Sequence, residues 1–145
     1  MGSNIQLGLT MTEITEKLVF ASSEWVDYAR LVLEDLVANH GEEGINYSAC
    51  EVFPEAPEGL AGPVANEASW HFIIEGTSVT VGEGRIPKAD FFVKYPYVKV
   101  LPIAREVYTP ERIELNRVER AKDPNAVLSP SYLSELHNKL AIITA

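Results

Sequence analysis

The segment from Ser69 to Tyr108 constrains the fold of this 145-residue chain more than any other part. Trp70, Phe72 and Ile74 alternate with more polar neighbours up to a turn near residue 76, and a stretch rich in apolar and aromatic residues follows. Side chains on one face of a strand recur with a period of two, so this pattern predicts a sheet with an apolar face. The segment carries no obvious catalytic motif, so it favours a protein that holds an apolar molecule over an enzyme that transforms one.

Capping residues and periodicity predict one long helix before the sheet. Ser22 and Ser23 provide a hydroxyl cap, and apolar residues then recur at helical spacing over residues 23–39. Gly41 is expected to take the left-handed conformation that often ends helices. Strands are expected over residues 45–53, 69–75, 79–82 and 89–94, with the second and third forming an antiparallel hairpin.

Three helical segments are expected after the strands. The first covers residues 97–108 and has Pro102 inside it, the second runs from Pro110 to about residue 122 behind a Thr109 cap, and the last begins after Ser129-Pro130. Strands in the middle with helices at both ends predict an α+β fold, with a mostly antiparallel sheet covered on one face by helices. We expect a flexible stretch over residues 1–15 and a single domain over residues 16–145.

The charge distribution argues against nucleic acid as a partner. The net charge is −9, and no Lys or Arg occurs between Arg30 and Arg85. Residues 1–84 hold 14 acids and 2 bases, a balance of −12, whereas residues 85–145 hold 7 acids and 10 bases, a balance of +3. Such an acidic surface repels phosphates. The two halves are expected to complement each other on one surface.

Cysteine content and hydropathy indicate a cytoplasmic protein. Cys50 is the single cysteine, which excludes an intramolecular disulfide and a thiolate zinc cluster and favours a reducing compartment. We expect Cys50 to be buried. No stretch of about 18 apolar residues and no signal-like amino terminus is present, so neither stable membrane insertion nor secretion is expected.

Metal and cofactor sites are not expected. His40, His71 and His137 are the three histidines, and no two of them are at metal-ligand spacing. The glycines at 76, 82 and 84 fit turns and do not form a phosphate-binding motif. His71 is expected to face solvent or to serve the structure, and His137 to pair with a neighbouring carbonyl.

Four sequence runs resemble the sterol carrier protein 2-like domain. They are Phe-Ala-Ser-Ser-Glu-Trp at 20–25, Trp-His-Phe-Ile-Ile-Glu-Gly at 70–76, Val-Thr-Val-Gly-Glu-Gly at 79–84 and Ala-Asp at 89–90. The likeness covers about residues 18–108. It implies a sheet with helices on one side that enclose an apolar tunnel for a sterol, a fatty acyl chain or a similar lipid, in an intracellular carrier or presenter.

The chain departs from that family after Tyr108. The family's further strands, with their Gly-Lys or Gly-Asp pattern beside the cavity, have no counterpart here, and two helices take their place. Either the sheet is truncated or the carboxyl-terminal helices replace part of the cavity wall.

The expected ligand-binding wall is the inward face of the strands and of the helix that follows them. Trp70 and Tyr97 are expected at the cavity mouth, because an aromatic ring with a polar tip suits that place. The segment from Pro54 to Glu67 is a candidate lid. The predicted wall residues are Trp70, Phe72, Ile74, Val79, Val81, Phe91, Val93, Tyr97 and Leu101.

Three alternatives stay open. The same apolar residues could be a filled core, since an apolar stripe is more often core than binding site. A small cofactor-independent isomerase, cyclase or dehydratase could use Asp90, Asp27 or His71 to move a proton on a hydrophobic substrate, although catalysis is less favoured than binding. The chain could also be a homodimer or an accessory subunit of a larger enzyme that docks through the stripe of Leu133, Leu136, Leu140 and Ile143.

Overall fold

A computed structural model describes residues 16–145, so the prediction of a flexible segment over residues 1–15 lies outside the described residues. The described chain forms a four-stranded sheet with helices packed on it, which confirms the expected α+β class. Its elements are α1 (Ser23–His40), β1 (Asn46–Pro54), β2 (Glu67–Glu75), β3 (Ser78–Glu83), β4 (Phe91–Lys94), α2 (Tyr97–Arg105), α3 (Pro110–Ala121), η2 (Ser131–Glu135) and α4 (Leu136–Ala141). Within residues 16–145, no helix is long and apolar enough to cross a membrane.

Helix α1 forms as the capping and periodicity predict. The Ser22 side chain accepts a hydrogen bond from the Trp25 amide, at 3.1 Å. One face of the helix is buried along its whole length, from Trp25 to Val37. The expected left-handed conformation at Gly41 is wrong, because this residue has φ −63° and ψ 147°. Glycine is needed there for space, since a Cβ would lie 2.6 Å from the Val37 carbonyl oxygen and 2.8 Å from that of Gly76.

The strand order in the sheet is β3-β2-β1-β4. β2 is antiparallel to both β1 and β3, whereas β1 and β4 run parallel, so the sheet is mixed but mostly antiparallel. The expected hairpin of β2 and β3 is confirmed, and Gly76 turns it with φ 64°. The register places Glu51 of β1 directly between Trp70 of β2 and Val93 of β4.

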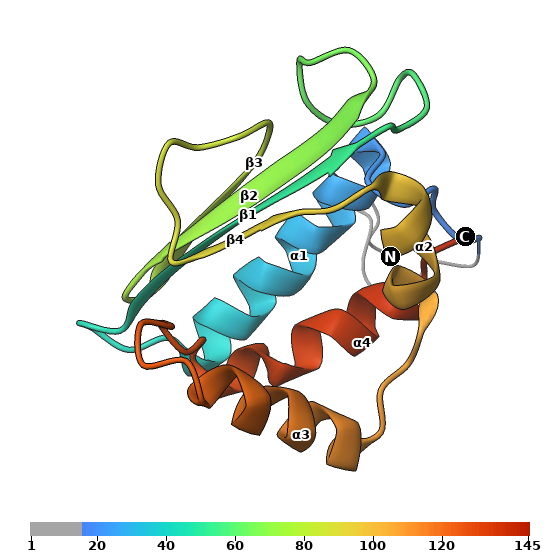
Figure 1. Ribbon diagram of the computed structural model, residues 1–145. Helices are drawn as coiled ribbons and strands as arrows, with labels where there is room; N and C mark the ends of the chain where they lie inside the picture. The colour runs from blue at the N-terminus through green and yellow to red at the C-terminus, as the bar shows by residue number, and fades with distance from the viewer. Residues whose placement is uncertain (1–15) are drawn as a thin grey trace, which may run out of the picture.

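All helices lie on the same side of the sheet (Figure 1). Helix α1 packs against β3, while α2 and α4 pack on each other and lie further out, beside the β1 and β4 half. Helix α3 begins behind its predicted Thr109 cap, whose hydroxyl accepts from the Arg112 amide at 3.1 Å. It forms the outer edge of the molecule and buries none of its side chains.

The last helical segment differs from the expectation in its first turns. Residues 131–135 form a 3₁₀ turn, η2, and the side chain of Ser129 does not cap it. The apolar stripe nevertheless forms, and Leu133, Leu140 and Ile143 are buried within the chain itself. Docking of this stripe on a second copy or a larger enzyme would therefore need the chain to open. Leu18 pairs with Thr144 in a short parallel bridge, which holds the end of α4 beside the start of the described chain.

The opposite face of the sheet is partly covered by loops. Gly84 donates a backbone hydrogen bond to the Ser69 carbonyl at 2.9 Å, and His71 Nδ1 lies 2.8 Å from the Gly84 carbonyl oxygen. His71 therefore has the structural role that was expected. Cys50 is fully buried, as expected, and Phe92 is 52% exposed on this face.

Candidate functional site

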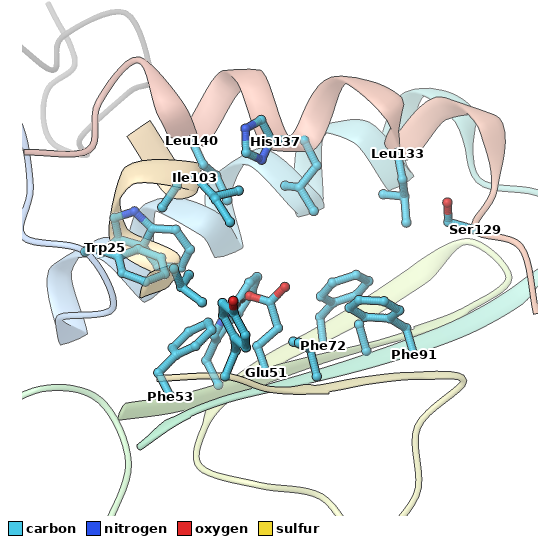
Figure 2. Close-up of a pocket in the computed structure, with 18 of the residues that line it drawn as sticks. Trp25, Glu51, Phe53, Phe72, Phe91, Ile103, Ser129, Leu133, His137 and Leu140 are labelled. Carbon is cyan, nitrogen blue, oxygen red and sulfur yellow. Dashed lines mark hydrogen bonds between the residues drawn. The ribbon is translucent and has the colours of Figure 1, made fainter. Parts of the chain in front are cut away.

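An apolar cavity of about 450 Å³ separates the sheet from the outer helices. Its floor is the inward face of β1, β2 and β4, and its roof is formed by α2, η2 and α4 (Figure 2). The lining consists almost entirely of aromatic and aliphatic side chains. The lining residues are Phe20, Trp25, Tyr47, Ala49, Glu51, Phe53, Trp70, Phe72, Phe91, Val93, Tyr95, Val100, Ile103, Ala104, Tyr108, Ser129, Leu133, Leu136, His137 and Leu140.

Small side chains keep this space open. Ala49 lies in the sheet between Phe72 of β2 and Phe91 of β4. Its methyl group is much smaller than the two rings beside it, so it leaves space above the sheet at this point. On the roof, Ala104 is the small lining residue of α2. The long helix α1 reaches the cavity only through Trp25, since its other buried residues cover the β2 and β3 half of the sheet. The cavity therefore lies between the carboxyl-terminal helices and the half of the sheet formed by β1 and β4, which α1 does not cover.

Glu51 is the one carboxyl group among the described residues that line the cavity. It comes from the middle of β1, and its side chain rises from the floor towards the roof helices (Figure 2). Its Oε1 accepts a hydrogen bond from the indole nitrogen of Trp70, at 2.8 Å. Trp70 is itself held edge-on by Trp25, with ring centroids 5.3 Å apart. The carboxyl is therefore fixed by aromatic side chains from two other elements.

The environment of Glu51 favours its neutral form. Burial among apolar side chains raises the pKa of the Glu51 carboxyl above its ordinary value of 4.5, and the hydrogen bond from Trp70 opposes this rise without cancelling it. No lysine or arginine is among the described residues that line the cavity. Glu51 is thus a carboxyl group without a basic partner in an apolar space.

Stacked polar rings form one side of the cavity rim. His137 of α4 stacks on Tyr108, with ring centroids 3.9 Å apart, and the guanidinium of Arg112 lies over the other face of the tyrosine. His137 Nε2 lies 2.6 Å from the carbonyl oxygen of Glu106, which confirms that this histidine pairs with a neighbouring carbonyl. Burial lowers the pKa of the His137 imidazole. Nearby, Tyr95 and Ile103 are among the most exposed lining residues and mark the cavity mouth.

The structure brings only part of the predicted wall to the cavity. Trp70, Phe72, Phe91 and Val93 line it. Ile74, Val79 and Val81 lie on the half of the sheet that α1 covers, and Leu101 packs against the core. The predicted wall residues that do not line the cavity are therefore Ile74, Val79, Val81, Tyr97 and Leu101.

Neither aromatic residue expected at the mouth lies there. Trp70 is only 3% exposed and sits at the floor beside Glu51. Tyr97 is buried, and its hydroxyl donates to the Phe20 carbonyl at 2.8 Å. In both cases the polar tip of the ring makes its hydrogen bond inside the protein, so the ring does not have to lie at the cavity mouth to reach water.

None of the residues considered for proton transfer reaches the cavity. Asp90 bonds the amide and hydroxyl of Ser48 near the outer face of the sheet, and Asp27 forms an exposed ion pair with Arg30 on α1. His71 points away from the cavity, as described above. The candidate lid from Pro54 to Glu67 contributes no lining residue, and backbone hydrogen bonds of Ala61 hold it against Ala21 and Ser69 instead.

Glu51 was the functional candidate that the sequence reasoning missed. The alternation of β1 already places it on the same face as Tyr47, Ala49 and Phe53. A carboxylate on the apolar face of a strand is costly unless it is paired or functional, and this is the signal that could have identified it.

The chain has no match in comparisons with protein-family models, with curated proteins and with solved structures. The site must therefore be interpreted from its own geometry.

Proposed function

We propose that the protein binds a small hydrophobic molecule, such as a sterol, a fatty acyl compound or a similar lipid, in the cavity between the sheet and α2, η2 and α4. The observation that carries this proposal is a cavity of about 450 Å³ with an almost wholly apolar lining. Small-molecule sites typically measure about 300–1,000 Å³ and combine apolar walls with a few polar groups. A carrier or presenter needs such a space and needs no catalytic group.

Burial of hydrocarbon supplies the affinity in this proposal. Each methylene group removed from water contributes about 0.8 kcal/mol, so ten buried carbons contribute roughly 8 kcal/mol before the costs of ordering the ligand are subtracted. The lining offers aromatic faces from Phe53, Phe72 and Phe91 along the floor and aliphatic side chains from α4 along the roof. Micromolar binding is therefore within reach without an ion pair.

The resemblance to the sterol carrier protein 2-like domain stays a prediction, and the proposal rests on the cavity. The roof explains how a cavity can form without the family's further strands, because Leu133, Leu136 and Leu140 from the carboxyl-terminal helices make part of its wall. The cytoplasmic location and a homodimer or enzyme partner also stay predictions.

Filling the cavity should weaken ligand binding. Ala104→Phe adds a ring to the roof, and we expect the affinity for a fluorescent fatty acid or sterol to fall more than tenfold while the protein stays folded. Val98 lies on the same helix and is 64% exposed, so Val98→Phe is the matched control and should bind like the wild type. Both tryptophans of the chain, Trp25 and Trp70, line the cavity, so their emission reports occupancy directly. Equal binding by the two variants would contradict the proposed site.

Glu51 favours a second candidate function, cofactor-independent proton transfer on a hydrophobic substrate. A carboxyl whose pKa is raised by an apolar cavity is suited to act as a general acid or base at a higher pH than an ordinary carboxyl group. A suitable probe is the conversion of cyclohex-3-en-1-one to its conjugated isomer, in which a base removes the α proton and returns a proton to the γ carbon. The candidate expects an absorbance change that Glu51→Gln abolishes. Equal rates for wild type, variant and buffer would remove it.

A further inference from the structure

Glu51 is the one carboxyl group on the floor of the cavity within the described chain. Glu51 lies at the centre of the sheet, with Trp70 and Val93 as its neighbours on the adjacent strands. The other lining residues that carry polar side-chain atoms are Ser129, His137, Tyr47, Tyr95 and Tyr108. His137 is engaged with Glu106 and Tyr108 at the rim. A ligand that lies along the apolar walls therefore meets the Glu51 carboxyl on the floor of the cavity.

The hydrogen bonds of Glu51 leave part of its carboxyl for a ligand. Trp70 Nε1 can only donate, and it uses its single proton on Oε1 at 2.8 Å. Within the described chain, this is the one hydrogen bond that the carboxyl makes. The second carboxyl oxygen, Oε2, has no hydrogen bond within the described chain, and the Glu51 side chain that carries it lines the cavity (Figure 2). A protonated carboxyl in this position offers one O–H donor and further acceptor capacity.

We propose that Glu51, held by Trp70, is the recognition point for an uncharged oxygen on the ligand, so that the cavity selects apolar alcohols and carbonyl compounds and rejects free carboxylates. This inference rests on the proposed binding function and names the ligand class. A hydroxyl can both accept from and donate to the carboxyl, and a ketone or ester oxygen can accept from its O–H. A carboxylate would bring a second acid into a space whose described lining contains no lysine or arginine.

Glu51 is only partly buried, so a ligand oxygen can reach its carboxyl from the cavity. A hydrogen bond made in these apolar surroundings favours a ligand with a matching oxygen over one without it. Sites that hydrogen-bond a ligand hydroxyl discriminate strongly against analogues that lack it. The apolar walls then provide affinity, while Glu51 provides orientation and selectivity.

The test compares three probes of equal chain length, 1-decanol, 2-decanone and decanoate, titrated at pH 7 and followed by tryptophan emission. For the wild type we expect decanol and decanone to bind more than tenfold more tightly than decanoate. Glu51→Leu removes the polar group and should lower the affinity for decanol about tenfold or more. Glu51→Gln keeps a neutral donor and acceptor in the same place and should retain most of the preference for the two neutral probes.

The pH dependence separates a recognition role from a merely structural one. Because the O–H donor is lost when Glu51 ionises, wild-type affinity for decanone should fall as the pH is raised through the folded-state pKa of Glu51, whereas that of Glu51→Gln should stay flat. The inference on ligand class is overturned if decanoate binds as tightly as decanol, or if Glu51→Leu leaves the decanol affinity unchanged. The proposed function itself fails if none of the three probes binds to the wild type or to Glu51→Leu.

Discussion

Replacing Trp25 by alanine is expected to lower the free energy of unfolding by about 3–5 kcal/mol, the range typical of large aromatic truncations in protein cores. Trp25 packs edge-on against Phe20 and Trp70, with ring centroids 5.1 Å and 5.3 Å away. Its indole nitrogen donates to the buried hydroxyl of Thr144 at 3.0 Å, so the side chain joins α1 to the end of the described chain. Urea unfolding followed by circular dichroism measures the effect.

Trp25→Phe is the matched control, because it keeps most of the ring contacts and removes the hydrogen bond to Thr144. We expect it to cost about 1–2 kcal/mol, clearly less than the alanine variant. A loss below about 1 kcal/mol for Trp25→Ala would show that the contacts between α1 and the cavity floor are not as the structure describes them.

Glu51→Gln is expected to stabilise the protein at neutral and alkaline pH, by on the order of 1–3 kcal/mol, and to have little effect at pH 4. The amide has nearly the shape of the carboxylic acid and can accept the same hydrogen bond from Trp70, but it never ionises. Free energies of unfolding measured across this pH range test the expectation. Glu75→Gln, at the exposed end of β2, is the control and should give a small difference at every pH.

The direction of this pH dependence follows from the raised pKa of Glu51. Below the ordinary pKa of 4.5 the Glu51 carboxyl is protonated in both the folded and the unfolded chain, so its ionisation does not lower the free energy of unfolding. As the pH rises towards the folded-state pKa, the unfolded chain releases the proton while the folded chain retains it, so wild-type stability falls. A variant whose gain shrinks as the pH rises would contradict burial of an acid in this cavity.

Local sequence signals predicted most of the elements. The Ser22 cap, the Thr109-Pro110 start and the Gly76 turn are decided by contacts within a few residues, and each lies where it was expected. The pairing of β4 with β1 was not predicted, because strand pattern specifies an apolar face but not a neighbour or a direction. The conformation of Gly41 was missed for a similar reason, since the atoms that crowd it include the carbonyl of Gly76, distant in sequence.

The candidate site was only partly predictable because its shape depends on how the helices divide the sheet. Strand alternation put Phe72 and Ile74 on the same inward face, and both do point inward. Only the first lines the cavity, because α1 covers the sheet around the second. The roof residues of η2 and α4 lie far along the chain from the strands, and no periodicity indicates which of them will face a void. Glu51 is different, since its position in β1 was readable from the start.

The uneven placement of the helices gives the molecule a rigid flank and a compliant one. Helix α1 buries eight residues and anchors the β2 and β3 side, whereas α3 contributes no buried residue and contacts the rest of the chain through its arginine side chains. Local opening draws on the regions with the least burial. Local opening is therefore expected to begin at α3 and its connecting loops, while the flank built on α1 stays folded.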